Sequence, residues 1–492
     1  MLRYKSLLEK STRLILLRAN DRSGAHPFLS ETNVSGVYPA LGLAYLAAAA
    51  RRAGFPVSIL DGHALNLSPA QITATISVGQ VQAVGLSATT YNWPIVRSLA
   101  RQIKATRPDI FIIVGGPQLS LFPEECLADP AIDAGVIGEG EEAVVELLDR
   151  LEQKADIAGL AGVVARRGSQ IVRGPDRPPQ QNLDSLPLPA LDLLPLSTYR
   201  ALTVSRPFIS MVASRGCPYH CRYCAQIYGG GVYREHGIDR MLAEMERAVS
   251  QFGAHEIIFF DETFTINRRR VLDFCAAITN RNLRVRWNIR TRCDLLDEEL
   301  MAAMYRAGCR SIHLGIESGS ARGQTELNKN LDLQKIPSIL ETARRLGLET
   351  RGYFMIGFPG ETLAEIEQTI QLAVNLPLDW ASFTITMPQA GTEFYNRGAA
   401  EGRFSLNYWR DYALGLMTGA PGYFTSPEYD AVHLEALLHS AYRRFYLRPR
   451  LLASKLRGRW WSELPTLWRT LLEIRPLKFS RRTTPTANEA AK

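Results

Sequence analysis

The sequence contains no long hydrophobic run. Its longest apolar stretch, residues 40–50, spans eleven residues, whereas a membrane-spanning helix needs about 18 or more. The first thirteen residues hold neither an apolar core nor a small-residue cleavage site, so we predict no signal peptide. Short-period repeats are absent, which excludes solenoid and array folds. We therefore expect a cytoplasmic protein without a membrane span.

Cysteine is scarce and unevenly placed. The chain of 492 residues has seven cysteines, an odd number spread too widely for a disulfide framework, which indicates a reducing compartment. Hydrophobic residues make up 46% and charged residues 22% of the chain, so a largely disordered protein is excluded. At about 100–200 residues per domain, the length predicts two to four domains.

Net positive charge is missing from most of the chain. The formal net charge is +8, but residues 443–482 alone hold twelve basic and two acidic side chains, a charge of +10. Because the last ten residues are neutral overall, the first 442 residues carry −2. The helical pattern over 430–482, with its tryptophans, predicts either a cap on the preceding domain or an amphipathic surface for anionic lipid and peripheral membrane contact. No nucleic-acid module accompanies the charge, so nucleic acid is not an expected partner.

Residues 1–173 alternate short apolar runs with helical patterns. Buried strands alternating with helices predict an α/β unit with a doubly wound parallel sheet, which binds ligands at the carboxyl ends of its strands. A small hairpin is expected over 162–173. The expected strands are 13–17, 57–60, 83–87, 110–116 and 134–138, and the expected helices include 39–54 and 93–105.

Proline marks the end of this unit. Residues 174–204 contain six prolines, a density that no packed helix or central strand tolerates, so we place a linker there. A second strand–helix series over 205–390 predicts a partial six-unit (β/α) barrel, and a helical, basic C-terminal region is expected over 391–492. The barrel strands are expected at 208–214, 255–261, 285–290, 311–318, 350–357 and 380–386, with helices over 239–252, 268–281, 332–346 and 361–375.

Three of the seven cysteines are clustered. Cys217, Cys221 and Cys224 follow the first barrel strand with the spacing Cys-x-x-x-Cys-x-x-Cys. Thiolates favour zinc or iron–sulfur clusters. A closed zinc site needs a fourth ligand, for which His220 is the candidate, although it is adjacent to Cys221. A four-iron cluster held by three thiolates instead leaves one iron open to a ligand that can receive an electron.

The barrel segment resembles the radical S-adenosylmethionine (SAM) family. The resemblance rests on the cysteine triad and on Tyr223 just before its last member, and it covers about residues 205–390. It implies that Cys217, Cys221 and Cys224 are the catalytic, metal-binding residues of a 4Fe–4S cluster. On that cluster SAM is cleaved to methionine and a 5′-deoxyadenosyl radical. The implied cofactor contacts at the triad loop and the strand ends are Tyr223, Gly229, Gly230, Asp261, Glu262, Arg292 and Glu317.

Several of these residues also have a plainer interpretation. The glycines of 229–231 suit an ordinary flexible loop, and residues 357–362, which match the cobalamin-linked branch of the family, also suit a turn that starts a helix. Arg290 and Arg292 are candidates for the SAM carboxylate or for solvent exposure. Cys275, Cys293 and Cys309 are expected to be structural.

Residues 13–150 resemble the flavodoxin-like cobalamin-binding domain of the same family. Asp61 and His63 match the start of an Asp-x-His-x-x-Gly motif in which the histidine binds cobalt, but Asn66 stands where the motif has glycine. His63 is therefore either a cobalt ligand or a loop histidine. A plain nucleotide-binding domain would show similar glycines. The implied cobalamin contacts are Asp61, His63, Ser87, Thr89, Gly115, Gly116, Gly138 and Glu139.

The two resemblances together imply an oxygen-sensitive, cobalamin-dependent radical SAM enzyme that functionalises an unactivated C–H bond. Methylation of a natural-product, tetrapyrrole or lipid-like substrate is favoured, with flavodoxin or ferredoxin as electron donor. An oxidative cyclase of the same family and a non-catalytic cobalamin- or redox-responsive binding protein are the alternatives. A methylthiotransferase is disfavoured, because its second cluster needs three N-terminal cysteines and only Cys126 precedes Cys217.

Overall fold

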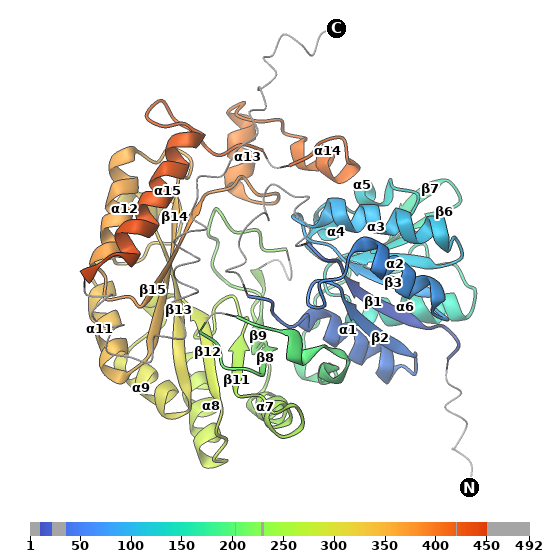
Figure 1. Ribbon diagram of the computed structural model, residues 1–492, viewed down its shortest axis with the longest axis horizontal. Coiled ribbons are helices and arrows are strands. Elements are labelled where there is room, and N and C mark those ends of the chain that lie inside the picture. The colour runs from blue at the N-terminus through green and yellow to red at the C-terminus, as the bar shows by residue number, and fades with distance from the viewer. Residues whose placement is uncertain (1–9, 22–35, 202, 228–230, 420, 450–492) are drawn as a thin grey trace.

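Two α/β units lie side by side in the computed structural model (Figure 1), which describes residues 10–21, 36–201, 203–227, 231–419 and 421–449. The N-terminal unit faces the open side of a curved sheet formed by the second unit. Residues 393–414 extend from the second unit toward the first, whereas the helix at residues 431–446 lies on the second unit. Among the described residues, no helix is long and apolar enough to cross a membrane.

The N-terminal unit is built on a seven-stranded sheet in the order β2-β1-β3-β4-β5-β6-β7. Its first five strands are parallel, as predicted from the apolar runs. The hairpin predicted over 162–173 is present and extends this sheet, because β6 pairs antiparallel with β5. The strands are β1 (Leu14–Arg18), β2 (Val57–Asp61), β3 (Ala83–Ser87), β4 (Phe111–Gly115), β5 (Ala134–Val136), β6 (Val163–Arg167) and β7 (Gln170–Arg173).

Helices cover both faces of this sheet, as its doubly wound pattern requires. One apolar core lies between the sheet and α1 and α6, and a second lies between the opposite face and α2 to α5. Of these helices, only α1 and α3 were named as predictions from the sequence, over residues 39–54 and 93–105. The helices are α1 (Leu41–Arg52), α2 (Pro69–Val78), α3 (Trp93–Thr106), α4 (Pro117–Leu121), α5 (Pro123–Leu127) and α6 (Glu141–Glu152).

The proline-rich segment 174–204 forms only short 3₁₀ turns, at Leu183–Ser185, Leu191–Leu193 and Leu196–Thr198. It touches both units. Asp192 accepts a hydrogen bond from Arg51 of α1 at 2.8 Å. Asp184 lies 3.0 Å from the ring of His236 in the second unit. These contacts on both sides fix the path of the segment between the two sheets.

The second unit is a six-stranded parallel sheet whose strands lie in chain order. The strand predicted over 208–214 is shorter than expected. It ends at Met211, and residues 214–215 pair instead with residues 234–235 as β9 and β10. The barrel strands are β8 (Phe208–Met211), β11 (Glu256–Phe259), β12 (Arg286–Thr291), β13 (Cys309–Glu317), β14 (Glu349–Ile356) and β15 (Trp380–Ile385).

Helices line the outer side of this sheet (Figure 1) and enclose a core that includes Phe259, Phe274 and Trp287. The four predicted helices are present, although two of them begin a few residues later than expected. The helix α9, between β12 and β13, was not predicted from the sequence. The helices are α7 (Ile238–Phe252), α8 (Arg268–Asn280), α9 (Glu298–Arg306), α10 (Ala321–Glu326), α11 (Ile336–Leu346) and α12 (Leu363–Asn375).

The C-terminal helices divide between the two units. α15 (Ala431–Tyr446) packs on β15, where the hydroxyls of Tyr442 and Tyr446 hydrogen-bond to the strand backbone at 3.0 and 2.8 Å. The first part of the predicted helical tail therefore caps the barrel, and the rest of that prediction, residues 450–482, lies outside the described residues. α13 (Glu393–Ala400) leads to α14 (Tyr408–Leu414), which packs against the N-terminal unit.

Candidate active site

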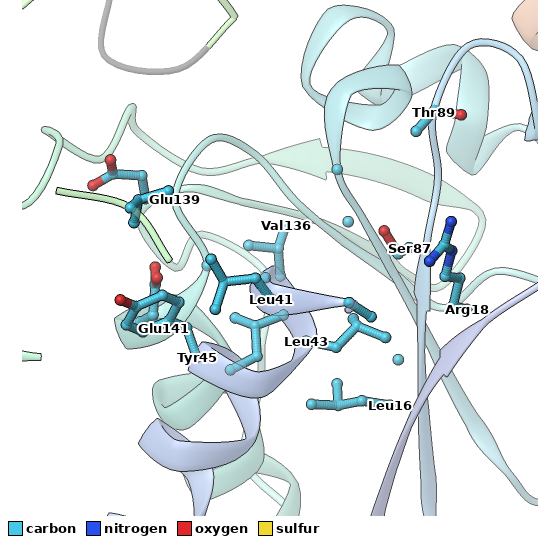
Figure 2. Close-up of a pocket in the computed structure, with 18 of the residues that line it drawn as sticks. Leu16, Arg18, Leu41, Leu43, Tyr45, Ser87, Thr89, Val136, Glu139 and Glu141 are labelled. Carbon is cyan, nitrogen blue, oxygen red and sulfur yellow. The ribbon is translucent and has the colours of Figure 1, made fainter. Parts of the chain in front are cut away.

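A cavity of about 640 Å³ lies between the two units. The N-terminal unit contributes the ends of β1, β3, β4 and β5 together with α1, and the second unit contributes Ser214, Gly216, Phe260 and Glu262. In Figure 2, Glu139, Glu141 and Tyr45 lie on one side of the cavity and Arg18, Ser87 and Thr89 on the other. Apolar side chains lie between them, namely Leu16, Leu41, Leu43 and Val136. An apolar wall with a few polar groups at its edges is typical of a cofactor site.

Six of the eight residues predicted to contact cobalamin line this cavity: Ser87, Thr89, Gly115, Gly116, Gly138 and Glu139. Glycine is needed at 116, because its φ is +104° and a Cβ there would lie 2.6 Å from the carbonyl oxygen of Ala88. A Cβ at Gly138 would meet no atom within 4 Å, so the backbone there is open to a ligand. The donor set and the bare backbone fit the cofactor predicted from the sequence.

Asp61 and His63 lie behind the cavity wall, outside the set of residues that line it. Asp61 is fully buried and accepts hydrogen bonds of 2.9 Å from the Tyr199 hydroxyl and from the Ala64 backbone. The Nδ1 atom of His63 contacts Asp21, which does line the cavity. Burial opposes ionisation of Asp21, but the contact with His63 and the nearby Arg18 hold its pKa below the usual value. Cobalt ligation by His63 stays a prediction.

Two carboxylates of the N-terminal unit hold the segment that carries the first clustered cysteine. Arg215, two residues before Cys217, forms an ion pair with Glu141 at 2.6 Å and lies 3.5 Å from Glu139. Glu139 also accepts two hydrogen bonds from Arg234, at 2.8 and 3.0 Å. Burial alone would raise the pKa of Glu139, but the hydrogen bonds from Arg234 and the charge of Arg215 hold it below its usual value.

These arginine contacts were not predicted from the sequence. Arg215 lies two residues before the cysteine triad, but its partner Glu141 is 74 residues away in the chain. Arg234 and Glu139 are separated by 95 residues. Local spacing carries no signal for such a pair, since the two residues meet only when both sheets are placed.

The three clustered thiols differ from the other four cysteines in exposure. Cys217 and Cys221 are half-buried and Cys224 is exposed, whereas the remaining cysteines are buried and unpaired: Cys126, Cys275, Cys293 and Cys309. Desolvation raises the pKa of Cys224 to about 11, and Glu262 and the neighbouring thiols add to the shift. At neutral pH a thiol with such a pKa is protonated, and a bound metal cation would favour its thiolate form.

Within the described residues, no three His, Cys, Asp or Glu side chains converge on one point that would hold a single metal ion. The closed zinc site considered from the sequence needs such convergence, with its ligands at tetrahedral positions around one ion. An iron–sulfur cluster uses its thiolates differently, because each one binds a separate iron. The triad also contacts the loop that follows β11, because Sγ of Cys217 lies 3.8 Å from the hydroxyl of Thr263 in that loop.

The two acidic residues after β11 have different surroundings. Asp261 is buried, and its carboxylate accepts hydrogen bonds from the Ala213 backbone at 2.9 Å and from the Ser214 hydroxyl. Desolvation raises the pKa of Asp261. Glu262 lines the cavity, and desolvation followed by repulsion from Asp261 raises its pKa. Asp261 therefore fixes the break between β8 and β9, and Glu262 is the member of the pair that faces the cavity.

Glu317 at the end of β13 connects to the cysteine loop through a lysine. It has a φ of +68° and is buried, and it lies 2.9 Å from Nζ of Lys329. Lys329 donates a second hydrogen bond, of 3.2 Å, to the hydroxyl of Tyr223. Lys329 was missed from the sequence, where it sits in a loop between two asparagines. The network places Glu317 and Tyr223, both predicted as SAM contacts, in one connected group.

Arg292 is buried rather than exposed to solvent. It forms two hydrogen bonds to Asp294, at 3.0 and 2.8 Å, and one of 2.7 Å to the backbone of Lys329. Its guanidinium carbon lies 4.0 Å from the ring centroid of Tyr219 within the cysteine loop. The solvent-exposed alternative for Arg292 is therefore wrong. The predicted contacts Gly229 and Gly230 lie outside the described residues.

Comparison with known proteins matches both units. The family model described as a B12 binding domain matches residues 32–148, and that of the Radical SAM superfamily matches residues 211–373. An uncharacterized methyltransferase of Pyrococcus horikoshii is 35% identical over 84% of this chain and 89% of its own length. An anaerobic magnesium-protoporphyrin IX monomethyl ester cyclase of Rubrivivax gelatinosus is 27% identical over 76% of this chain and 68% of its own length.

The fold also matches a solved structure. The cobalamin-dependent SAM radical enzyme OxsB, with aqua-cobalamin and SAM bound, has a TM-score of 0.71 and 16% identity, covering 93% of this chain and 71% of that one. At this coverage the similarity in fold extends over both units. With the two family matches and the relative that aligns over most of both chains, it leads to one conclusion: the chain belongs to the cobalamin-dependent radical SAM enzymes.

Proposed function

We propose that this enzyme transfers a methyl group to a carbon atom of a small organic substrate. The observation that carries the proposal is the shared cavity, whose lining includes predicted cobalamin contacts from one unit and Gly216 and Glu262 beside the cysteine triad from the other. A single space open to both cofactor sites suits a reaction in which a substrate meets both. The methyltransferase name of the relative from Pyrococcus horikoshii supports the same reaction class.

In this proposal Cys217, Cys221 and Cys224 hold the 4Fe–4S cluster. When bound, the cluster and SAM supply the radical that removes a hydrogen atom, and cobalamin supplies the methyl group. The residues of the chain bind, orient and shield these groups. Asp261 fixes the backbone at Ala213 and Ser214, just before the triad, through its hydrogen bonds.

We also propose which residues contact SAM and cobalamin. We assign SAM to the side of the triad that carries Glu262, Arg292 and the Glu317–Lys329–Tyr223 network, with Gly229 and Gly230 as further contacts. We assign cobalamin to the cavity wall of the N-terminal unit, with Asp61 and His63 behind it. The apolar wall excludes water from the cofactor's edge, and the backbone groups at Gly115, Gly116 and Gly138 suit its amides.

An oxidative cyclisation is the second candidate, because one relative is named as a magnesium-protoporphyrin cyclase. The two reactions share the hydrogen-abstraction step and differ in what happens to the substrate radical. A methyl transfer adds one carbon from SAM to the product. A cyclisation removes hydrogen and adds none.

The decisive experiment is anaerobic reconstitution with iron, sulfide, cobalamin and reductant, followed by incubation with methyl-labelled SAM and cell extract. We expect 5′-deoxyadenosine, S-adenosylhomocysteine and a labelled methylated product. A Cys221→Ala variant should lose cluster absorbance and all three products, whereas Cys275→Ala, at a buried cysteine of α8, should keep them. Loss of substrate hydrogen without label would favour cyclisation, and cluster binding by Cys221→Ala would remove the assignment of the triad.

We also propose an electron donor for the cluster and a lipid contact for the basic tail. A small acidic donor such as flavodoxin or ferredoxin would supply the electron that cluster chemistry needs. Contact of the tail with anionic lipid stays a prediction, since residues 450–492 lie outside the described residues. Sedimentation with anionic liposomes of the full chain and of a chain ending at residue 449 measures it, and equal binding by both would contradict it.

A further inference from the structure

Four neighbouring strands carry a row of side chains at one level on the inner face of the barrel. The backbone register pairs Arg290 of β12 with His313 of β13, His313 with Arg351 of β14, and Arg351 with Trp380 of β15. Alternate residues of β14 are buried against the outer helices, and Arg351 and Tyr353 belong to the half-exposed set on the other face. The row therefore faces the interior of the barrel.

The two arginines of this row have no partner of opposite charge. Within the described residues, neither the Arg290 nor the Arg351 guanidinium forms an ion pair or a hydrogen bond, and Nε of Arg351 is buried without a partner. Arg290 lies 4.2 Å from the ring centroid of Phe260, and Arg351 lies 5.7 Å from that of Trp380. Arg234 and Arg292, by contrast, are each bound to a carboxylate. Partly buried cations without a counter-ion are costly, so this pair indicates an absent anion.

The groups beside the arginines suit an anion. The hydroxyl of Tyr353 lies 2.9 Å from Nδ1 of His313. Burial, followed by the charges of Arg351 and Arg290, holds the pKa of His313 well below its usual value, so the ring is neutral and acts through hydrogen bonds. One acid, Glu349, shares this face of β14, and its carboxylate accepts a 3.4 Å hydrogen bond from Ser311. The row is therefore net positive.

The row adjoins the cofactor cavity: His313 and Arg351 lie inside β13 and β14, and Arg290 lies one residue before the end of β12. Tyr38, from the N-terminal unit, lines the cavity, and its ring centroid lies 5.2 Å from that of Phe260, which also lies under Arg290. His313 precedes Glu317 by four residues, which corresponds to about 13 Å along the strand. The four side chains are not among the residues that line the cavity, so an anion held by them would lie next to it, behind Tyr38 and Phe260.

We infer that Arg290 and Arg351, with His313 and Tyr353, bind a carboxylate or phosphate group of the substrate and hold its reacting carbon toward the cofactor cavity. This inference rests on the proposed function, because it names the substrate class of the same site. Two guanidinium groups at one level of the sheet, with β13 between their strands, suit the oxygens of either anion. The group bound is the substrate's anion, and the carboxylate of SAM is the competing assignment that the test separates.

The test measures anion binding directly, so it needs no known substrate. Inorganic phosphate and acetate are titrated by calorimetry into the anaerobically reconstituted enzyme carrying cluster and cobalamin. We expect Arg351→Gln and Arg290→Gln each to weaken binding of at least one anion by about tenfold, which is the order of one charge-assisted hydrogen bond. Arg344→Gln, at an exposed position of α11, is the matched control and should bind as the parent does.

Two further measurements complete the design. SAM affinity by equilibrium dialysis should change less than twofold in Arg351→Gln, and an equal loss of SAM and phosphate binding would overturn the inference. Arg351→Lys, which keeps the charge, should restore most of the anion binding if the protein is folded, as judged by cobalamin retention. Phosphate and acetate affinities equal to the control in both glutamine variants would also overturn it. Failure of methyl transfer alone would instead count against the proposed function, because anion binding is read separately.

Discussion

At the residue scale, the acidic groups of the two cofactor regions differ in what they bind. Glu139 accepts hydrogen bonds from an arginine of the other unit, and Asp261 accepts one from the backbone of Ala213 beside the triad. Glu262 lines the cavity. The sequence identified all three from their positions after strands. It did not separate them by role, because a carboxylate's partner is set by tertiary contacts that adjacent residues do not reveal.

One buried acid at the interface gives a pH prediction. Glu244 of α7 accepts a 3.4 Å hydrogen bond from Tyr45 of α1, and desolvation raises its pKa from 4.5 to about 7. Because the folded state holds this proton more tightly than the unfolded state, stability falls as pH rises from about 4.5 to 7 and stays low above that. We expect Glu244→Gln to remove this loss, which amounts to about 3 kcal/mol at pH 8. Chemical denaturation at pH 5 and pH 8 measures it.

The control for this prediction lies on the same helix. Glu246 is only half-buried and pairs with Arg281 at 3.0 Å, so Glu246→Gln should leave the pH dependence of unfolding as it is in the parent. An identical pH dependence in Glu244→Gln and in the parent would show that Glu244 is ionised throughout, and the prediction would fail.

At the element scale, the strand β9 is positioned by the opposite unit. Arg215 of β9 pairs with Glu141 at the first turn of α6, and both side chains are largely buried. The N-terminus of a helix favours an acidic side chain. The dipole of α6 therefore stabilises the Glu141 carboxylate in addition to its ion pair with Arg215. The first cysteine of the triad, Cys217, lies two residues after Arg215, and its loop is thereby tied to the wall of the cavity between the two units.

A double-mutant cycle tests this pair. We expect Glu141→Gln and Arg215→Met to show a coupling energy of about 1–3 kcal/mol in the free energy of unfolding. Arg215→Met leaves the buried Glu141 carboxylate unpaired, and Glu141→Gln leaves Arg215 with only its longer contact to Glu139. The exposed pair Glu298–Arg345, at 2.9 Å, is the matched control and should show a coupling of about 0.5 kcal/mol or less. Equal coupling energies for the two pairs would contradict a special role for Arg215.

The elements also show what sequence patterns can and cannot predict. Long apolar runs such as 83–87 and 110–116 predicted strands to within one residue, since burial on both faces leaves no alternative pattern. The run 208–214 predicted one strand where two exist, because the break depends on Asp261, 48 residues further along the chain from Ala213. The spacing showed that the three cysteines are clustered, and their role as cluster ligands stays a prediction. Lys329 and Arg215 were not identified, because their partners lie far away in sequence.

At the scale of the whole molecule, the two units are connected at two separate places. The segment 174–204 joins the two units on one side, and α14 joins them on another (Figure 1). Trp93 of α3 donates a 2.9 Å hydrogen bond to the backbone of Ala413, and the hydroxyl of Tyr412 donates one of 2.8 Å to the backbone of Thr90. The cavity lies between units that are attached at both sites.

Loosening α14 should therefore affect both units. We expect Tyr412→Ala to remove about 2–4 kcal/mol of packing between α14 and the N-terminal unit. Limited proteolysis should then cut near residues 408–419 faster, and cobalamin should dissociate faster from the reconstituted enzyme. Tyr442→Ala, on α15 against the barrel alone, should leave both rates near those of the parent. Equal acceleration in both variants would indicate general destabilisation instead.

The position of α14 in the chain bears on how the enzyme is made. Residues 408–414 leave the ribosome after both sheets are complete, so the nascent protein passes through a stage in which its two units are joined by the proline-rich segment and have no α14 between them. The contacts of Trp93 and Thr90 with α14 can therefore form only once the strands of both sheets have been synthesised.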